Sequence, residues 1–226
     1  MKRGKYTILI LVITASIIVF LLLNLLLGSV SIPFASVWNI LTGGEGDPVA
    51  WQNIILKSRL PQALTALVAG AGLSISGLQM QTIFRNPLAG PSVLGISSGA
   101  SLGVAFVVLL SGQLGGVALS RLGFIGEVAL SIAAIAGALS VMGLIVLASR
   151  KVAGSVTLLI IGVMIGYIAN AVIGVLKFFS VEEDIKAYVI WGLGSFARVS
   201  GNQMMLFVTI MAVIIPLSFL LLKPLN

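Results

Sequence analysis

The sequence predicts an all-α membrane protein, a polytopic bundle of helices, and three observations support this prediction. First, 59% of the 226 residues are hydrophobic and only 8% are charged, whereas soluble domains have about 25% charged residues. Second, six segments come close to the roughly 20 mostly apolar residues that a helix needs to cross a bilayer. Third, basic and acidic residues are sorted between alternate connections, as membrane topology requires.

The first apolar segment, Tyr6–Leu27, is longer than the roughly 7–15 residues of a signal-peptide hydrophobic region, so we interpret it as an uncleaved span. A short helix is predicted over Phe34–Leu41, where Pro33 begins it and Gly43–Gly44 end it. The other predicted spans are Leu60–Gln79, Leu94–Leu110, Val128–Leu147, Leu158–Leu176 and Met204–Leu222.

The charged residues orient these spans. With the N-terminus in the cytoplasm, seven basic residues and no acidic residue face that side: Lys2, Arg3, Lys5, Arg85, Arg150, Lys151 and Lys223. All six acidic residues then lie outside, which is the bias found in membrane proteins. Among them, the run Glu182–Asp184 is interpreted as a solvated outer loop.

Composition excludes several kinds of chemistry. The chain has neither cysteine nor histidine, so disulfides, thiol nucleophiles and the usual zinc sites are excluded. It has no phosphate-binding P-loop motif, and we predict no catalytic residue, no metal site and no cofactor. Basic residues are scattered, which argues against nucleic acid and leaves membrane lipid as the surrounding partner. No acidic residue falls within a predicted span, which argues against a proton relay.

Glycines recur at the four-residue spacing that allows helices to approach closely in lipid. They form two series, Gly95, Gly99 and Gly103 in one segment, and Gly162 and Gly166 in another. Helix packing is the interpretation we adopt for them. Lining of a substrate path is the alternative.

The stretch from Arg59 to Gly103 carries a specific resemblance. It contains R-x-P, then S-G-x-x-x-Q, then R-N-P-L-A-x-P-x-x-L-G-x-x-x-G-A. This pattern resembles the FecCD family of binding-protein-dependent ABC importer permeases, which carry iron–siderophore complexes, haem and cobalamin. A second block, Thr157–Val172 followed by Trp191–Phe196, resembles the same family. The resemblance implies about ten spans of the usual length, a permease dimer, two separate ATPase subunits, an external binding protein and a place in the cytoplasmic (inner) membrane.

The resemblance also implies site residues. Arg59, with Lys57 beside it, would dock the external binding protein, although Gln62 stands where the family usually has a second arginine. Anchoring of a helix end at the membrane interface is the alternative. Asn86 and Leu88 would form a cytoplasmic gate, with Ser155, Val156 and Thr157 as its second layer. A simple helix-breaking turn or contact with the ATPase are the alternatives. The acidic run Glu182–Asp184 could also contact the binding protein.

Leu225 and Asn226 resemble the first residues of the family's L-N-x-L-x-L-G-E cytoplasmic loop. We therefore expect a fragment with six of about ten spans, a single transmembrane permease domain over residues 1–226 that forms the N-terminal part of a longer fold. The predicted function is the permease subunit of an importer for an iron(III)–siderophore or related chelate, and not an enzyme. A secondary carrier of a small solute and a non-transporting membrane protein are the alternatives.

Overall fold

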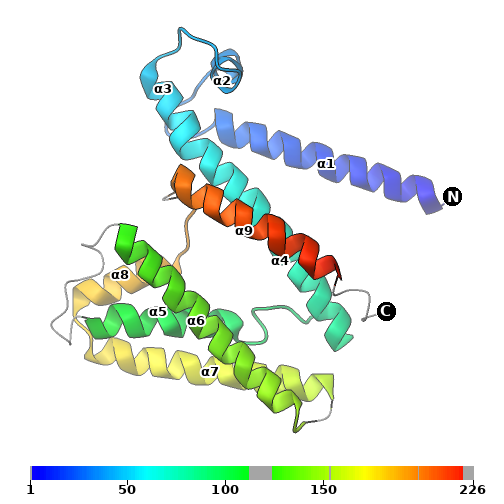
Figure 1. Ribbon diagram of the computed structural model, residues 1–226, viewed down its shortest axis with the longest axis vertical. Coiled ribbons are helices and arrows are strands. Elements are labelled where there is room, and N and C mark those ends of the chain that lie inside the picture. Colours follow the sequence, from blue (N-terminus) through cyan, green and yellow to red (C-terminus); the bar gives the residue numbers. More distant parts are fainter. Residues whose placement is uncertain (1, 112–123, 153, 198, 221–226) are drawn as a thin grey trace. The chain divides into compact units, whose positions relative to one another are not determined.

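The computed structural model describes residues 2–111, 124–152, 154–197 and 199–220, and their regular structure is helical (Figure 1). The chain divides into two compact units. Unit 1 holds the helices before Gly72 and the last helix, and unit 2 holds the elements from Leu73 to Ser195. The elements are α1 (Lys2–Leu26), α2 (Phe34–Leu41), α3 (Val49–Ile54), the π-helical turn η1 (Ile55–Arg59), α4 (Leu60–Phe84), α5 (Ile96–Ser111), α6 (Phe124–Ser149), α7 (Ser155–Phe179), α8 (Glu182–Gly192) and α9 (Gly201–Leu220).

Within the described residues, five helical segments are long and apolar enough to cross a membrane. They are Gly4–Leu26, Val49–Phe84, Ile125–Ser149, Ser155–Phe179 and Gly201–Leu220. The all-α membrane class is therefore confirmed, and the protein is a multi-pass membrane protein. The remaining predicted span corresponds to α5, whose apolar part, Ile96–Leu110, is shorter. The count of six spans stays a prediction, since residues 112–123 lie outside the described part of the chain.

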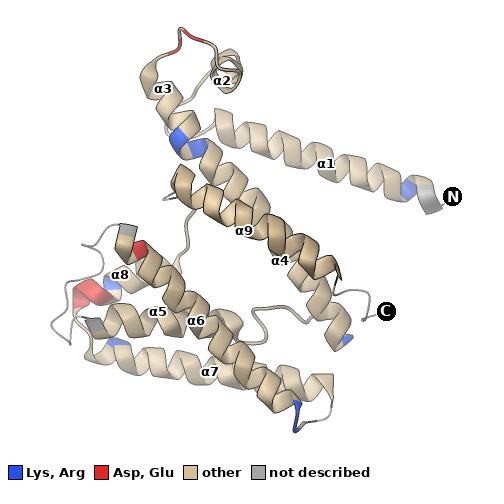
Figure 2. Cartoon of the chain, viewed as in Figure 1, with Lys and Arg blue, Asp and Glu red and all other residues tan. Residues whose placement is uncertain are grey.

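The positions of charged residues support this assignment, because the central parts of α1, α4, α6, α7 and α9 carry no charged residue (Figure 2). Lys57 and Arg59 lie in the first third of the segment Val49–Phe84. α6 begins earlier than predicted, so Glu127 lies in its first turn instead of just before the span. The predicted single domain over residues 1–226 stays a prediction, since α4 runs through both units. The end that resembles the family's cytoplasmic loop, Leu225–Asn226, lies outside the described residues.

The second span begins earlier than the predicted Leu60, because α3, η1 and α4 follow one another without a break from Val49. Pro61 lies inside this continuous helix, although proline lacks the N–H and its ring clashes with the carbonyl four residues before it. The π-helical turn Ile55–Arg59 ends two residues before this proline. Its wider turn moves the preceding carbonyls, which is how a proline is tolerated inside a continuous helix.

The prediction of a solvated outer loop at Glu182–Asp184 was wrong, because the run is the first turn of a helix and one of its three residues is buried. Here α8 begins, and Glu182 and Glu183 are exposed, whereas Asp184 is only 7% exposed. The reason is helical periodicity, which turns residues three or four apart to the same face. Asp184 therefore shares its face with Tyr188, which is buried against α5 and α7.

The described residues of unit 1 form one apolar cluster. It joins the end of α1 to the segments that follow it, through Leu25, Ile32, Val37, Ile40 and Ile55. The predicted helix Phe34–Leu41 is confirmed with Pro33 before it, and Gly43 takes a positive φ of 80° just after it. This cluster gives the C-terminal end of α1 its packing.

The described residues of unit 2 form two apolar clusters along α5, α6 and α7. One contains Phe84, Ala89, Leu94, Val141, Ile145 and Leu159, and it joins the end of α4 and the following turn to α6 and α7. The other contains Val104, Ala105, Val108, Leu109, Ile173 and Tyr188, and it joins α5, α7 and α8. The turn after α4 is thus packed at one end of the three-helix group.

Candidate functional site

The turn after α4 begins with a helix cap of the Schellman type. Arg85 has a positive φ of 46°. Its N–H donates to the Thr82 carbonyl at 3.3 Å, and the Asn86 N–H donates to the Gln81 carbonyl at 3.1 Å. Glycine usually occupies this left-handed position, and another residue there costs roughly 1–2 kcal/mol. Arg85 therefore ends α4 sharply with its side chain exposed.

Asn86 holds the next part of the turn, where the gate is predicted. Its Oδ1 accepts the Leu88 N–H at 2.9 Å, and its carbonyl accepts the Ala89 N–H at 3.1 Å. Ala89 is buried in the cluster under the turn, whereas Leu88 is 81% exposed. Asn86 and Pro87 thus form a rigid base that presents the Leu88 side chain outward.

The predicted second layer of the gate is the start of α7. Gly154 precedes it with a positive φ of 104°, and Val156 and Thr157 are exposed while Ser155 is half-buried. Leu159, one turn further on, shares a cluster with Ala89 and Phe84. The structure therefore brings the two predicted gate segments to the same end of unit 2 through a shared apolar cluster.

The packing glycines at the start of α5 lie against α7. Gly95 has a φ of 73°, and a Cβ added to it would lie 2.6 Å from the Gly162 carbonyl oxygen and 3.0 Å from the Gly166 nitrogen. A Cβ on Gly162 would lie 2.8 Å from the Leu94 Cα. A Cβ on Gly166 would be in ordinary contact with Gly95. Gly95 is therefore required both by its backbone conformation and by the approach of α7.

Further along α5, two glycines lie against α6. A Cβ on Gly99 would lie 2.7 Å from the Gly137 carbonyl oxygen, and one on Gly103 would lie 2.1 Å from the Ala133 carbonyl oxygen. A Cβ on Gly137 would lie 2.1 Å from the Gly99 oxygen. Sequence reasoning missed Gly137. The signal that could have found it is the spacing of four residues between Ala133 and Gly137, the same small-residue spacing that was recognised in α5.

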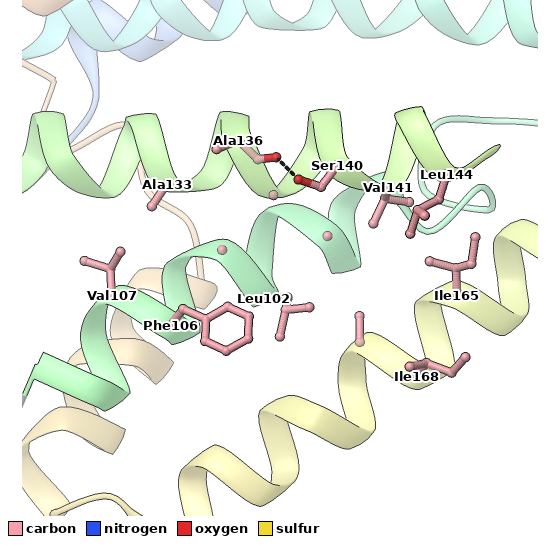
Figure 3. A pocket seen from close by; sticks show the side chains of 14 residues that line it. Leu102, Phe106, Val107, Ala133, Ala136, Ser140, Val141, Leu144, Ile165 and Ile168 are labelled. Atoms are coloured by element: carbon pink, nitrogen blue, oxygen red, sulfur yellow. Dashed lines mark hydrogen bonds between the residues drawn. The ribbon is translucent and has the colours of Figure 1, made fainter. Parts of the chain in front are cut away.

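An apolar cavity of about 450 Å³ lies along these glycines, between α5, α6 and α7 (Figure 3). Its polar side chain, Ser140, donates its hydroxyl to the Ala136 carbonyl of the same helix at 2.8 Å. The cavity therefore presents hydrocarbon. Its lining residues are Gly99, Leu102, Gly103, Phe106, Val107, Ala133, Ala136, Gly137, Ser140, Val141, Leu144, Ile165, Ile168 and Ala169.

The two residues predicted to dock a binding protein differ in exposure. Arg59 is only 6% exposed, and its guanidinium donates to backbone carbonyls at the end of α1. Lys57 is exposed, as the last-turn neighbour of Arg59 in η1. Gln62, which stands in place of the family's second arginine, donates to the Ser58 hydroxyl at 3.0 Å. Of the two basic side chains, Lys57 is the one open to a partner.

Metal-binding side chains do not gather within the described residues, where no group of three or more His, Cys, Asp or Glu residues could hold an ion. The candidate site is therefore a set of backbone turns, glycine contacts and apolar surfaces in a membrane-spanning helical protein.

Comparison with known proteins identifies the family of this helical membrane protein. The model of the FecCD transport family matches residues 16–226. The chain therefore belongs to the FecCD transport family, as the R-N-P-L-A-x-P pattern predicted.

Three relatives illustrate the match. An iron chelatin transport system permease protein of Helicobacter pylori is 41% identical over 63% of this chain and 39% of its own length. The hemin transport system permease protein of Yersinia pestis is 32% identical over 79% of this chain and 50% of its own. The vitamin B12 import system permease protein of Salmonella paratyphi A is 36% identical over 76% and 48%. The chain thus spans about half the length, or less, of the curated relatives it matches.

One solved structure has a similar fold. It is described as a metal-chelate type ABC transporter in an inward-facing conformation, and it matches with a TM-score of 0.76 and 26% sequence identity. The match covers 98% of this chain and 64% of the other.

Proposed function

We propose that this chain is the transmembrane permease subunit of a binding-protein-dependent ABC importer, which translocates an iron(III)–siderophore or related metal chelate such as haem or cobalamin. The observation that carries the proposal is the family match over residues 16–226. The relatives' names support the substrate class, since they include iron chelate, hemin and vitamin B12 transport.

The protein would lie in the cytoplasmic (inner) membrane with its N-terminus in the cytoplasm. The sorting of charges supports this orientation, because the cytoplasmic connections would carry only basic residues. Arg85 and the pair Arg150–Lys151 are exposed at the ends of α4 and α6, respectively, where those connections begin.

The chain would work within an assembly. A second permease subunit would complete the path, two ATPase subunits would hydrolyse ATP, and an external binding protein would deliver the chelate. The absence of a P-loop motif in this sequence supports the assignment of ATP hydrolysis to separate subunits.

The turn after α4 and the start of α7 would form the cytoplasmic gate of the path. Leu88 would be the obstructing side chain, and Asn86 would hold it, because Asn86 fixes the Leu88 N–H while the Leu88 side chain is exposed. Ser155, Val156 and Thr157 would form the second layer, carried by the cluster that Leu159 shares with Ala89. Opening would move both layers when the ATPases close on ATP.

The apolar path suits a bulky chelate. A cargo that must leave as well as enter cannot be held by strong charge pairs, and the cavity beside α5 presents one polar side chain among hydrocarbon. Specificity for a particular chelate would then come from the external binding protein. Docking of that protein would use the positive charge of Lys57, which is exposed in the π-helical turn η1.

Uptake by whole cells tests this proposal. Cells that lack the gene for this chain should lose uptake of radio-iron supplied as a siderophore chelate, and the full-length gene should restore it. Replacement of the P-loop lysine in the partner ATPase should abolish uptake as completely as loss of the gene. Uptake that continues with that inactive ATPase would instead identify a secondary carrier, and unchanged uptake without this gene would identify a non-transporting protein.

A further inference from the structure

Arg59 is enclosed by the C-terminal end of α1. Its Nη1 donates to the Leu25 carbonyl at 2.6 Å and to the Leu26 carbonyl at 3.0 Å, and its Nη2 donates to the Val30 carbonyl. The side chain is 6% exposed. One guanidinium thus serves three carbonyls of a segment about thirty residues earlier in the chain.

Leu25 and Leu26 lie in the last turn of α1, and Val30 lies in the segment that follows it. The Leu26 carbonyl also accepts the Ile32 N–H at 3.4 Å. The last four carbonyls of an α-helix have no N–H to accept within it, and an unsatisfied group is most costly near a membrane, where water is scarce. A cation at this end also interacts favourably with the helix dipole. Arg59 therefore caps α1 from the beginning of the next span.

The space for the guanidinium is shaped for it. A Cβ on Gly28 would lie 2.6 Å from Arg59 Nη2 and 3.1 Å from Cζ. Leu25 and Ile55, almost completely buried, belong to the apolar cluster on the same segments. Because Gly28 has no side chain, the Arg59 guanidinium can occupy the space beside it. The apolar side chains of the cluster exclude water that would otherwise bind the same carbonyls.

Lys57 has the opposite situation, although it lies in the same π-helical turn. Its side chain is exposed, and the turn places it away from the enclosed side that Arg59 occupies. An ammonium group at a surface remains free to pair with a carboxylate of another molecule.

We propose that Arg59 is a positioning residue that fixes the C-terminal end of α1 to the start of the second span. Positive charge for docking then comes from Lys57, and this assignment rests on the proposed importer function. This division of roles differs from the docking role that the sequence predicts for Arg59. Its three carbonyl bonds would have to break before the guanidinium could reach a partner.

Four variants of the full chain, purified in its native complex, separate the two roles. Arg59→Gln and Gly28→Ala should each lower the Tm by roughly 5–10 °C, because both break the hydrogen bonds between the guanidinium and the carbonyls. Arg59→Gln also removes the positive charge, whereas Gly28→Ala keeps it. Arg59→Lys should fall between them and the wild type, since an ammonium cannot serve three carbonyls in a fixed plane. Lys57→Gln, the matched control, should leave the Tm unchanged.

Affinity for the external binding protein is the second readout. Lys57→Gln should weaken it about twofold to fivefold, the effect of one exposed charge pair. An Arg59→Gln variant with unchanged Tm and weakened docking would overturn the proposal. If Lys57→Gln binds the binding protein as tightly as the wild type does, the docking role of Lys57 is overturned, and the role of Arg59 is unaffected. If no binding protein binds even the wild type, the proposed importer fails while the Tm series still decides the role of Arg59.

Chemical modification of the wild type covers the case in which the variants do not fold. Phenylglyoxal should react with the exposed Arg85 and Arg150 well before Arg59, as followed by mass spectrometry of the peptides. Reaction of Arg59 at the same rate as these two controls would contradict its enclosed position.

Discussion

The two units of this protein hold their helices in different ways. In unit 2, α5 approaches α6 and α7 so closely that glycine Cα atoms and backbone carbonyls are in contact. In unit 1, α1 is exposed over most of its length, and a buried guanidinium with one apolar cluster fixes its C-terminal end. The helix contacts of unit 2 depend on glycines, which have no side chain, whereas the fixed end of α1 in unit 1 depends on the long side chain of Arg59.

This difference follows from what a bilayer offers. Lipid solvates apolar surface as well as another helix does, so hydrophobic burial gives little reason for helices to associate. Association then needs either close backbone packing or satisfaction of polar groups. Gly99, Gly103 and Gly137 supply the first, and Arg59 supplies the second for carbonyls at a helix end.

The largest effect is expected at Gly137. Gly137→Ala would place a Cβ 2.1 Å from the Gly99 carbonyl oxygen, and backbone cannot move aside as a flexible side chain can. We expect a loss of roughly 3 kcal/mol or more in stability, measured as Tm of the purified protein or as loss of folded protein from the membrane.

Gly143 is the matched control in the same helix, because a Cβ there would meet nothing within 4 Å. Gly143→Ala should be neutral or gain up to about 1 kcal/mol from helix propensity. Equal losses of stability in Gly137→Ala and Gly143→Ala would contradict the close contact between α5 and α6.

Asp184 is a polar exception inside the glycine-packed unit. Burial, and secondarily the charge of Glu183, raise its pKa above the ordinary value of 3.8, and Oδ2 has no hydrogen-bond partner within the described part of the chain. The folded protein therefore keeps this proton to higher pH than the unfolded chain does. Stability should fall as pH rises from about 4 through the folded pKa.

Asp184→Asn should remove that pH dependence. At neutral pH the variant should be more stable than the wild type, because the neutral amide removes the ionisation that burial penalises, and the difference should vanish below pH 4. Thermal melts at both pH values measure this, with the exposed Glu182→Gln as control. A stability difference that is the same at both pH values would contradict the buried, unpaired carboxylate.

The turn after α4 in unit 2 contains an exposed side-chain hydrogen bond, from the Leu88 N–H to Asn86 Oδ1. It contrasts with the buried guanidinium of Arg59 in unit 1. Asn86→Ala should cost about 1 kcal/mol, because the Leu88 N–H loses its acceptor, whereas Asn86→Asp keeps that acceptor. Leu88→Ala should leave the Tm unchanged, since the side chain is 81% exposed, and should alter chelate uptake or leak. Unchanged uptake and leak in Leu88→Ala would argue against a gate at this residue.

The smallest effect is expected at Gly72 in unit 1. A Cβ there would lie 2.2 Å from the Met211 Cε, the flexible end of a long side chain. Gly72→Ala should therefore change stability by no more than about 0.5 kcal/mol, because the methionine moves and helix propensity improves. Gly70→Ala, with nothing within 4 Å, is the control. A loss as large as that of Gly137→Ala would erase the contrast between the two units.

The sequence predicted much of the fold, because spans and glycine spacing are local signals. The all-α membrane class, the helix Phe34–Leu41 and the R-N-P-L-A-x-P turn could all be found from patterns a few residues long. Continuity of the second span through Pro61 could not, since the π-helical turn that accommodates the proline has no sequence signature.

Two site residues depended on contacts between distant segments. The burial of Asp184 follows from the packing of α8 against α5, and the enclosure of Arg59 follows from the carbonyls at the end of α1. Residues about thirty positions apart along the chain meet there, and the spacing of residues within one segment does not reveal such a meeting.

Uptake into proteoliposomes tests most directly the proposal that this chain is the permease subunit of an ATP-driven importer. The complete transporter would be reconstituted with its binding protein outside and ATP trapped inside, and radio-iron chelate accumulation would be followed with time. The account predicts accumulation that requires internal ATP and the binding protein and that does not change when ionophores collapse ion gradients. Accumulation that needs an ion gradient and proceeds without ATP would contradict it.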